Sequence, residues 1–146
     1  MSNQPVIKGL YTVLADTYAL TIKTHNYHWN VEGPGFASLH QLFENQYNEL
    51  FEATDVLAER MRALDSKVNG GLAAFAKVSS IADGDVNLTA EQMLEDLHDG
   101  HQRGRLRGGG HDERLPAVAG ADETLKRRWQ RGSQRRHFNQ ARCPWP

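Results

Sequence analysis

The chain has 146 residues, which fits one domain with a sizeable hydrophobic core, and its formal net charge is −1. The single cysteine, Cys143, excludes an intramolecular disulfide and gives no sign of an oxidising compartment. We expect neither a secretion signal nor a membrane span, because the N-terminal residues lack a signal pattern and no apolar stretch is long enough.

Two long helices are predicted first. Over residues 6–31 apolar and aromatic residues recur at steps of three or four in two stripes, a pattern typical of a helix buried on more than half of its circumference. Gly33, Pro34 and Gly35 end this helix, because proline cannot continue it and glycine adopts turn conformations. The short connection makes the second helix, predicted over residues 38–64, an antiparallel neighbour of the first.

A longer connection and a third long helix follow. Glycines break the pattern at residues 69–71, and residues 72–80 predict a short helix inside the connection. The third long helix has a well-specified start, with Thr89 as the N-cap, Gln92 as its reciprocal partner, and apolar residues at the hydrophobic staple positions. Its apolar pattern stops after Leu97.

Residues 101–146 differ from the rest of the chain. Residues 1–100 carry 6 Lys and Arg against 14 Asp and Glu, while residues 101–146 carry 11 against 4. Glycines interrupt the arginine-rich part, which disfavours a helix, and no fourth core-facing helix of bundle length is visible. We interpret residues 1–100 as the folded domain and residues 101–146 as a divergent segment, either a shifted reading frame or a basic tail that neutralises nucleic-acid phosphates.

Four potential metal ligands lie on one stripe of the second predicted helix, namely His40, Glu44, Asp55 and Glu59. At about 100° per residue they fall within roughly 100° of the helix circumference. His40 and Asp55 are nevertheless about 22 Å apart along the helix axis, so one copy of this helix cannot close a single site. A solvated polar face is the alternative interpretation, since charged side chains are mostly exposed.

The spacing of these four residues is symmetric about the midpoint of the helix. A two-fold axis through that midpoint would place His40 of one copy opposite Glu59 of the other, and it would also place Glu44 opposite Asp55. The sequence therefore predicts two equivalent sites shared across a dimer. His28, at the end of the first helix, faces the same space across the turn. Histidine with several carboxylates suits Fe(II), manganese or zinc, although a purely structural zinc site usually contains more histidine or cysteine.

These residues carry a family resemblance. The motifs His28-Trp29-Asn30, His40-x-x-x-Glu44 and Asp55-x-x-x-Glu59-Arg60 resemble the signature of Dps proteins, the DNA-protection ferritins of starved cells. The resemblance covers about residues 5–100 and includes the Gly-Pro turn and the short helix in the long connection.

The resemblance implies an all-α, ferritin-like four-helix bundle whose subunits form two-fold dimers and a hollow twelve-subunit shell. Residues 101–146 do not resemble the second half of the family's third helix or its fourth helix. The implied activity is that of a ferroxidase, which oxidises Fe(II), preferably with hydrogen peroxide, stores ferric iron and protects DNA. The iron ligands and catalytic residues would be His28, His40 and Glu44 from one subunit and Asp55 and Glu59 from its mate.

The resemblance also implies a cytoplasmic protein, associated with the nucleoid where it binds DNA non-specifically. Two other interpretations follow from residues 101–146. One is an inactive helical remnant of a truncated or frameshifted protein. The other is a nucleic-acid-binding module that acts through its basic C-terminus.

Overall fold

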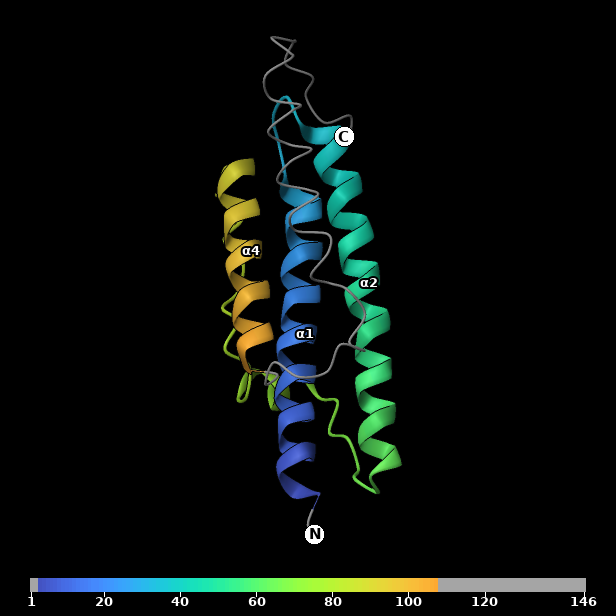
Figure 1. Cartoon of the computed structure of the whole chain (residues 1–146). Coiled ribbons are helices and arrows are strands. Elements are labelled where there is room, and N and C mark those ends of the chain that lie inside the picture. The colour runs from blue at the N-terminus through green and yellow to red at the C-terminus, as the bar shows by residue number, and fades with distance from the viewer. Residues whose placement is uncertain (1–2, 108–146) are drawn as a thin grey trace.

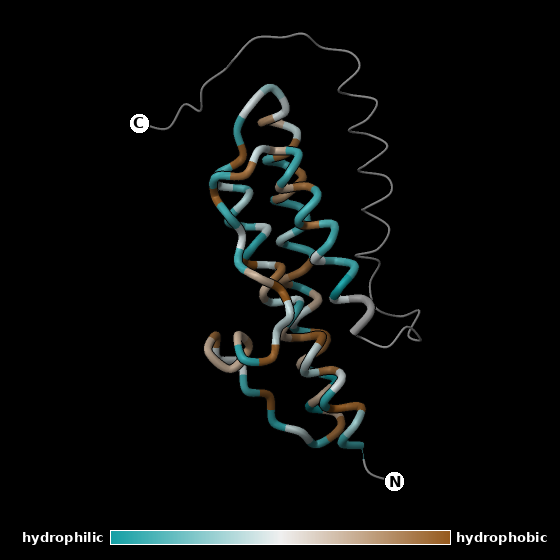
Figure 2. The backbone as a smooth tube through the Cα atoms, turned by 90° about the vertical axis from the view of Figure 1, so that its left-hand side faces the viewer, coloured by the Kyte–Doolittle hydropathy of each residue, from teal (hydrophilic) through white to brown (hydrophobic). Residues whose placement is uncertain are grey.

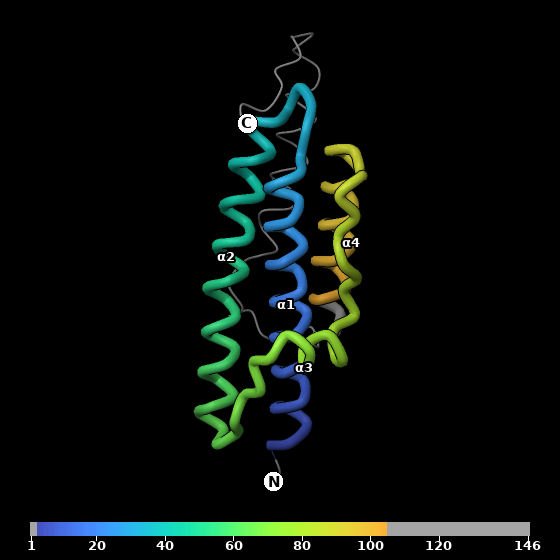
Figure 3. The backbone as a smooth tube through the Cα atoms, turned by 180° about the vertical axis from the view of Figure 1, so that it is seen from behind, coloured from blue at the N-terminus to red at the C-terminus, as the bar shows by residue number. Residues whose placement is uncertain are grey.

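A hairpin of two long helices, α1 (Gln4–Asn30) and α2 (Phe36–Ala63), forms the frame of the protein in a computed structural model that describes residues 3–107. The third long helix, α4 (Ala90–Arg107), lies against the other side of α1 and runs antiparallel to it (Figure 1). The connection from α2 to α4 carries the short helix α3 (Leu72–Ala76) across α1, so that α2 and α4 run in the same direction (Figure 3). The predicted all-α bundle is confirmed, and no helix in the described part is long and apolar enough to cross a membrane.

The turn between α1 and α2 lies where the sequence predicted it. Both helices begin and end within two residues of the predicted ranges. Gly33 has a φ of +103°, a left-handed backbone conformation that residues other than glycine rarely adopt. The N–H of Val31 donates to the carbonyl oxygen of Tyr27 at 2.9 Å and closes the last turn of α1.

The predicted capping box starts α4. The Thr89 N–H donates to Oε1 of Gln92 at 2.9 Å, and the Gln92 N–H donates to Oγ1 of Thr89 at 3.3 Å. Leu88 and Met93, which flank the box at the staple positions, belong to the same hydrophobic cluster. The N-terminal signal in the sequence is therefore confirmed.

The end of α4 differs from the prediction. The apolar pattern predicted an end after Leu97, but α4 continues to Arg107. The reason is close packing, because a Cβ atom added to Gly100 would lie 2.7 Å from Cδ2 of Leu20 on α1. Glycine is unfavourable for an isolated helix, yet here it allows the two helices to approach, and tertiary packing overrides propensity.

The predictions for the chain beyond α4, including the shifted reading frame, the basic tail and the missing fourth helix, lie outside the described residues.

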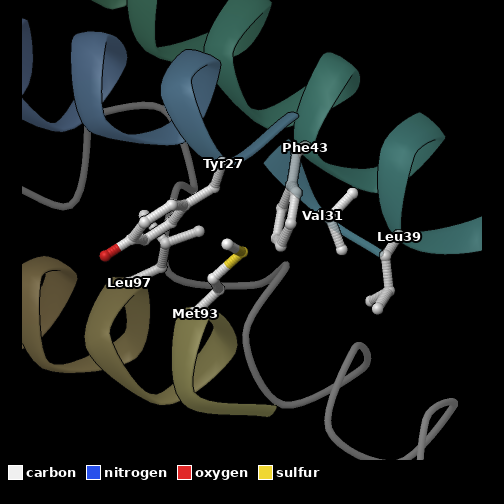
Figure 4. Packing of buried hydrophobic residues seen from close by; sticks show 6 residues of the cluster. All are labelled: Tyr27, Val31, Leu39, Phe43, Met93 and Leu97. Carbon is white, nitrogen blue, oxygen red and sulfur yellow. The ribbon is translucent and has the colours of Figure 1, made fainter. Parts of the chain in front are cut away.

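Two hydrophobic clusters fix α1 between its neighbours. The cluster near the α1–α2 turn joins all three long helices (Figure 4), through Tyr27, Val31, Leu39, Phe43, Met93 and Leu97. The second cluster lies further toward the start of α1 and includes Leu14, Ala15, Leu57, Met61 and Phe75. Apolar and polar positions alternate along the helices (Figure 2), as expected for amphipathic helices that bury one face.

An ion pair between a buried lysine and a half-buried aspartate joins α1 to α4. Nζ of Lys23, whose side chain is only 4% exposed, donates to both carboxylate oxygens of Asp96, at 3.1 and 2.9 Å. The Tyr27 hydroxyl also donates to Asp96. Burial alone would raise the pKa of Asp96, but these hydrogen bonds and the Lys23 charge outweigh it and hold the pKa below its ordinary value. Burial and the bond to Asp96 raise the pKa of Tyr27.

We predict that Asp96→Asn lowers the free energy of unfolding by about 2 kcal/mol near neutral pH, because the buried Lys23 ammonium loses its carboxylate partner. The folded-state pKa of Asp96 lies below its ordinary 3.8, so the carboxylate stabilises the fold above that pH. This contribution is lost as the pH falls through the folded-state pKa. In urea denaturation at a series of pH values, the difference between wild type and variant should shrink below pH 3.8.

The matched control is Asp99→Asn, since Asp99 is exposed on the same helix. An Asp96→Asn effect at neutral pH as small as that of the control would contradict a stabilising role for the ion pair.

Candidate metal centre

His28 and His40 form a reciprocal pair across the α1–α2 turn. Nδ1 of His28 lies 2.9 Å from the carbonyl oxygen of His40, and Nδ1 of His40 lies 2.8 Å from the carbonyl oxygen of His28. The two imidazole rings stack, with centroids 3.7 Å apart and an interplanar angle of 23°. Because the pair joins the end of α1 to the start of α2, the hairpin itself positions both rings.

The hydrogen bonds fix the tautomer of each ring. A carbonyl oxygen can only accept, so Nδ1 of each neutral imidazole carries the proton and donates it. The lone pair then belongs to Nε2, which is the arrangement that a metal-ligating histidine with a backbone carbonyl partner requires. The pair therefore offers two imidazole nitrogens to a cation from one place on the hairpin.

Aromatic rings surround the pair. The ring of Phe36 lies 5.0 Å from that of His40, and the ring of Tyr47 meets His28 edge-on at 5.3 Å. His25 stacks on Tyr47 and also contacts Trp29, with centroid distances of 4.2 and 4.1 Å. Burial, and then the charge of His28, lower the pKa of His25. Within this group of rings His28 is buried and His40 is half-buried.

The three carboxylates predicted as ligands lie along α2 and apart from the histidine pair. Glu44 is half-buried one turn beyond His40, and its Oε2 accepts a hydrogen bond from Gln41 at 3.1 Å. Asp55 and Glu59 lie farther along the helix and are exposed. Within the described residues, no three histidine, cysteine or acidic side chains of one chain come together as a group that could hold a metal ion. In a single chain, the histidine pair and the three carboxylates therefore do not form one metal site.

The sequence reasoning missed two contributions to this region. The contacts of Phe36 and Tyr47 with the histidine pair were not expected, although Tyr47 lies seven residues, or about two turns, after His40 and so shares its helix face. The Lys23–Asp96 pair, which fixes α4 behind the adjacent part of α1, was also missed. Its partners are 73 positions apart, and nothing in the local sequence pattern joins them.

Comparison with known proteins matches the fold and the sequence to one class. A family model for the ferritin-like domain matches residues 7–104. A low-temperature-induced protein of Nostoc sp. is 41% identical over 102 residues, covering 68% of this chain and 56% of that protein. DNA protection during starvation protein 2 of Bacillus anthracis is 39% identical over 93 residues, covering 64% of each chain.

A solved structure extends the comparison. The crystal structure of Dps from Staphylococcus aureus superposes with a TM-score of 0.69 at 28% identity, covering 94% of this chain and 99% of that one. The fold and the family match define a ferritin-like protein. Within that class, the chain belongs to the Dps family. It spans a little over half the length of the first curated relatives that it matches, at 56% of each.

We predict that both His28 and His40 carry their proton on Nδ1 when they are neutral. Long-range proton–nitrogen correlation spectra of the ¹⁵N-labelled protein report the tautomer of each ring, and His28→Gln and His40→Gln variants assign the signals. A proton on Nε2 of either ring would contradict the reciprocal hydrogen bonds and remove that ring as a ligand through Nε2.

Proposed function

We propose that the protein is an iron-binding ferroxidase and iron-storage protein. The observation that carries this proposal is the reciprocal His28–His40 pair, which leaves the Nε2 lone pair of each ring available at the start of the helix that carries the predicted carboxylate ligands. Mixed imidazole and carboxylate donors suit Fe(II), which is here a substrate and a cargo. Membership of the Dps family supports the same chemistry.

The site is completed by a second copy of the chain. In a two-fold dimer centred on the middle of α2, Asp55 and Glu59 of one copy approach the histidine pair of the other. The exposure of both carboxylates in the single chain supports this arrangement, because they are accessible to a partner. Each dimer then contains two equivalent sites, with His28, His40 and Glu44 from one subunit and Asp55 and Glu59 from its mate.

Hydrogen peroxide is the preferred oxidant. Two Fe(II) ions each give up one electron, the O–O bond of one peroxide breaks, and two protons complete two water molecules. Twelve subunits form a shell that holds the ferric product in the cytoplasm. Removing Fe(II) and peroxide together limits the formation of hydroxyl radicals and so protects DNA, in line with the name of the Bacillus anthracis relative.

We predict that His40→Ala and Asp55→Ala each reduce Fe(II) oxidation at least about tenfold, because each removes a ligand from every site. After subunit exchange, an equal mixture of the two variants should recover about one quarter of the wild-type rate. Half of the dimers are then hybrids, and each hybrid contains one intact site. The measurement is stopped-flow absorbance of Fe(III) formation with peroxide.

The matched control is a mixture of His40→Ala with His28→Ala. These two residues belong to the same half of the site, so every site in their hybrid lacks one histidine and no activity should return. Equal recovery in both mixtures, or no recovery in the first after exchange is confirmed by mass spectrometry, would contradict a site shared in this way.

A second function is favoured by the charge distribution. Residues 101–146 carry 11 basic against 4 acidic side chains, which suits non-specific binding to the phosphates of DNA.

We predict a gel shift with duplex DNA that weakens steeply as salt rises and is lost when residues 108–146 are removed. A shift that the shortened chain retains would assign DNA binding to the helical domain, and absence of a shift at low salt would exclude this function.

A further inference from the structure

The connection from α2 to α3 contains the only Asn-Gly pair of the sequence, Asn69-Gly70. Asn69 is exposed and belongs to neither helix, since α2 ends at Ala63 and α3 begins at Leu72. A Cβ atom added to Gly70 would meet no atom of the described chain within 4 Å beyond its sequence neighbours. The side chain of an asparagine reaches the next backbone nitrogen most easily before a glycine, because glycine has no Cβ to block the approach.

Two hydrogen bonds converge on Asn69. The Tyr11 hydroxyl, on α1, donates to the backbone carbonyl oxygen of Asn69 at 2.9 Å. The N–H of Gly71 donates to the side-chain oxygen Oδ1 of Asn69 at 3.3 Å. Each of the two carbonyl groups of this residue therefore has its own donor.

Both donors lie where negative charge develops when an asparagine cyclises. The nucleophile is the Gly70 nitrogen, which shares a peptide group with the Asn69 carbonyl, so loss of its proton spreads charge onto that carbonyl oxygen. The Tyr11 hydroxyl stabilises this charge. Attack on the side-chain carbonyl carbon then moves the charge to Oδ1, where the Gly71 N–H stabilises it. Donors held in place before the reaction lower the barrier of acyl transfer in the same way.

We propose that Asn69 is a modification site, at which Tyr11 and the Gly71 N–H promote spontaneous deamidation. A bond forms between the Gly70 nitrogen and Cγ of Asn69, the Cγ–Nδ2 bond breaks, and Nδ2 leaves as ammonia with the proton of the Gly70 N–H. Water then opens the succinimide at either carbonyl and leaves an aspartyl or an isoaspartyl residue, each with a new carboxylate. The reaction is independent of the proposed function, because it involves neither iron nor a second copy of the chain.

The test follows deamidation of the purified full chain in mildly alkaline buffer. Peptide mapping by mass spectrometry detects the gain of about 1 Da at each asparagine, and electron-transfer dissociation distinguishes isoaspartate from aspartate. Asn87 is the internal control, since it is also exposed in a connection but precedes Leu88. Asn69 should react at least about tenfold faster than Asn87, because the leucine side chain hinders the geometry of attack.

The contribution of the Tyr11 hydroxyl is measured with Tyr11→Phe, which keeps the ring that lies 5.9 Å from that of Phe75. This variant should slow deamidation of Asn69 about fivefold, the usual effect of one hydrogen bond, and leave Asn87 unchanged. The matched control is Tyr18→Phe, because the ring of Tyr18 lies 5.0 Å from that of the same phenylalanine. It should keep the wild-type rate.

A second variant, Gly70→Ala, tests the nucleophile. The open space around Gly70 accommodates the methyl group, so helix content by circular dichroism should not change while deamidation of Asn69 slows. Deamidation of Asn69 no faster than that of Asn87 would overturn the site. A rate in Tyr11→Phe equal to or above that of the wild type, or equal slowing in Tyr18→Phe, would overturn the role of the hydroxyl.

Discussion

The reciprocal hydrogen bonds between His28 and His40 are the constraint on which the rest of the structure depends. They form only when the end of α1 and the start of α2 lie side by side, which the turn at Gly33 makes possible. The same contacts that close the hairpin also set the tautomer of both rings. One local interaction thus joins the folding of the hairpin to the chemistry of the candidate metal centre.

Much of this arrangement follows from local sequence signals. The Gly-Pro-Gly turn and the Thr89 capping box predicted the helix boundaries, since each depends on neighbouring residues. The end of α4 could not be predicted from local sequence signals, because the contact between Gly100 and Leu20 joins residues from different helices. The Lys23–Asp96 pair was missed for the same reason. Local rules predict elements well, whereas partners that meet only in the fold stay invisible to them.

The candidate site was predictable in part. The sequence placed His28 and His40 in the same space, and the structure brings their rings into contact. The assignment of Glu44, Asp55 and Glu59 to the same centre is still a prediction, because it depends on a second copy of the chain. The predicted ligands on α2 and the exposed Phe51 lie on one face of that helix.

The most direct test of this account is a crystal structure of the protein soaked with Fe(II) under anaerobic conditions, with anomalous scattering used to locate the metal. We predict iron density between His28 and His40 of one copy and Asp55 and Glu59 of its two-fold mate. Iron held by ligands from a single chain, or found away from the His28–His40 pair, would contradict the shared site.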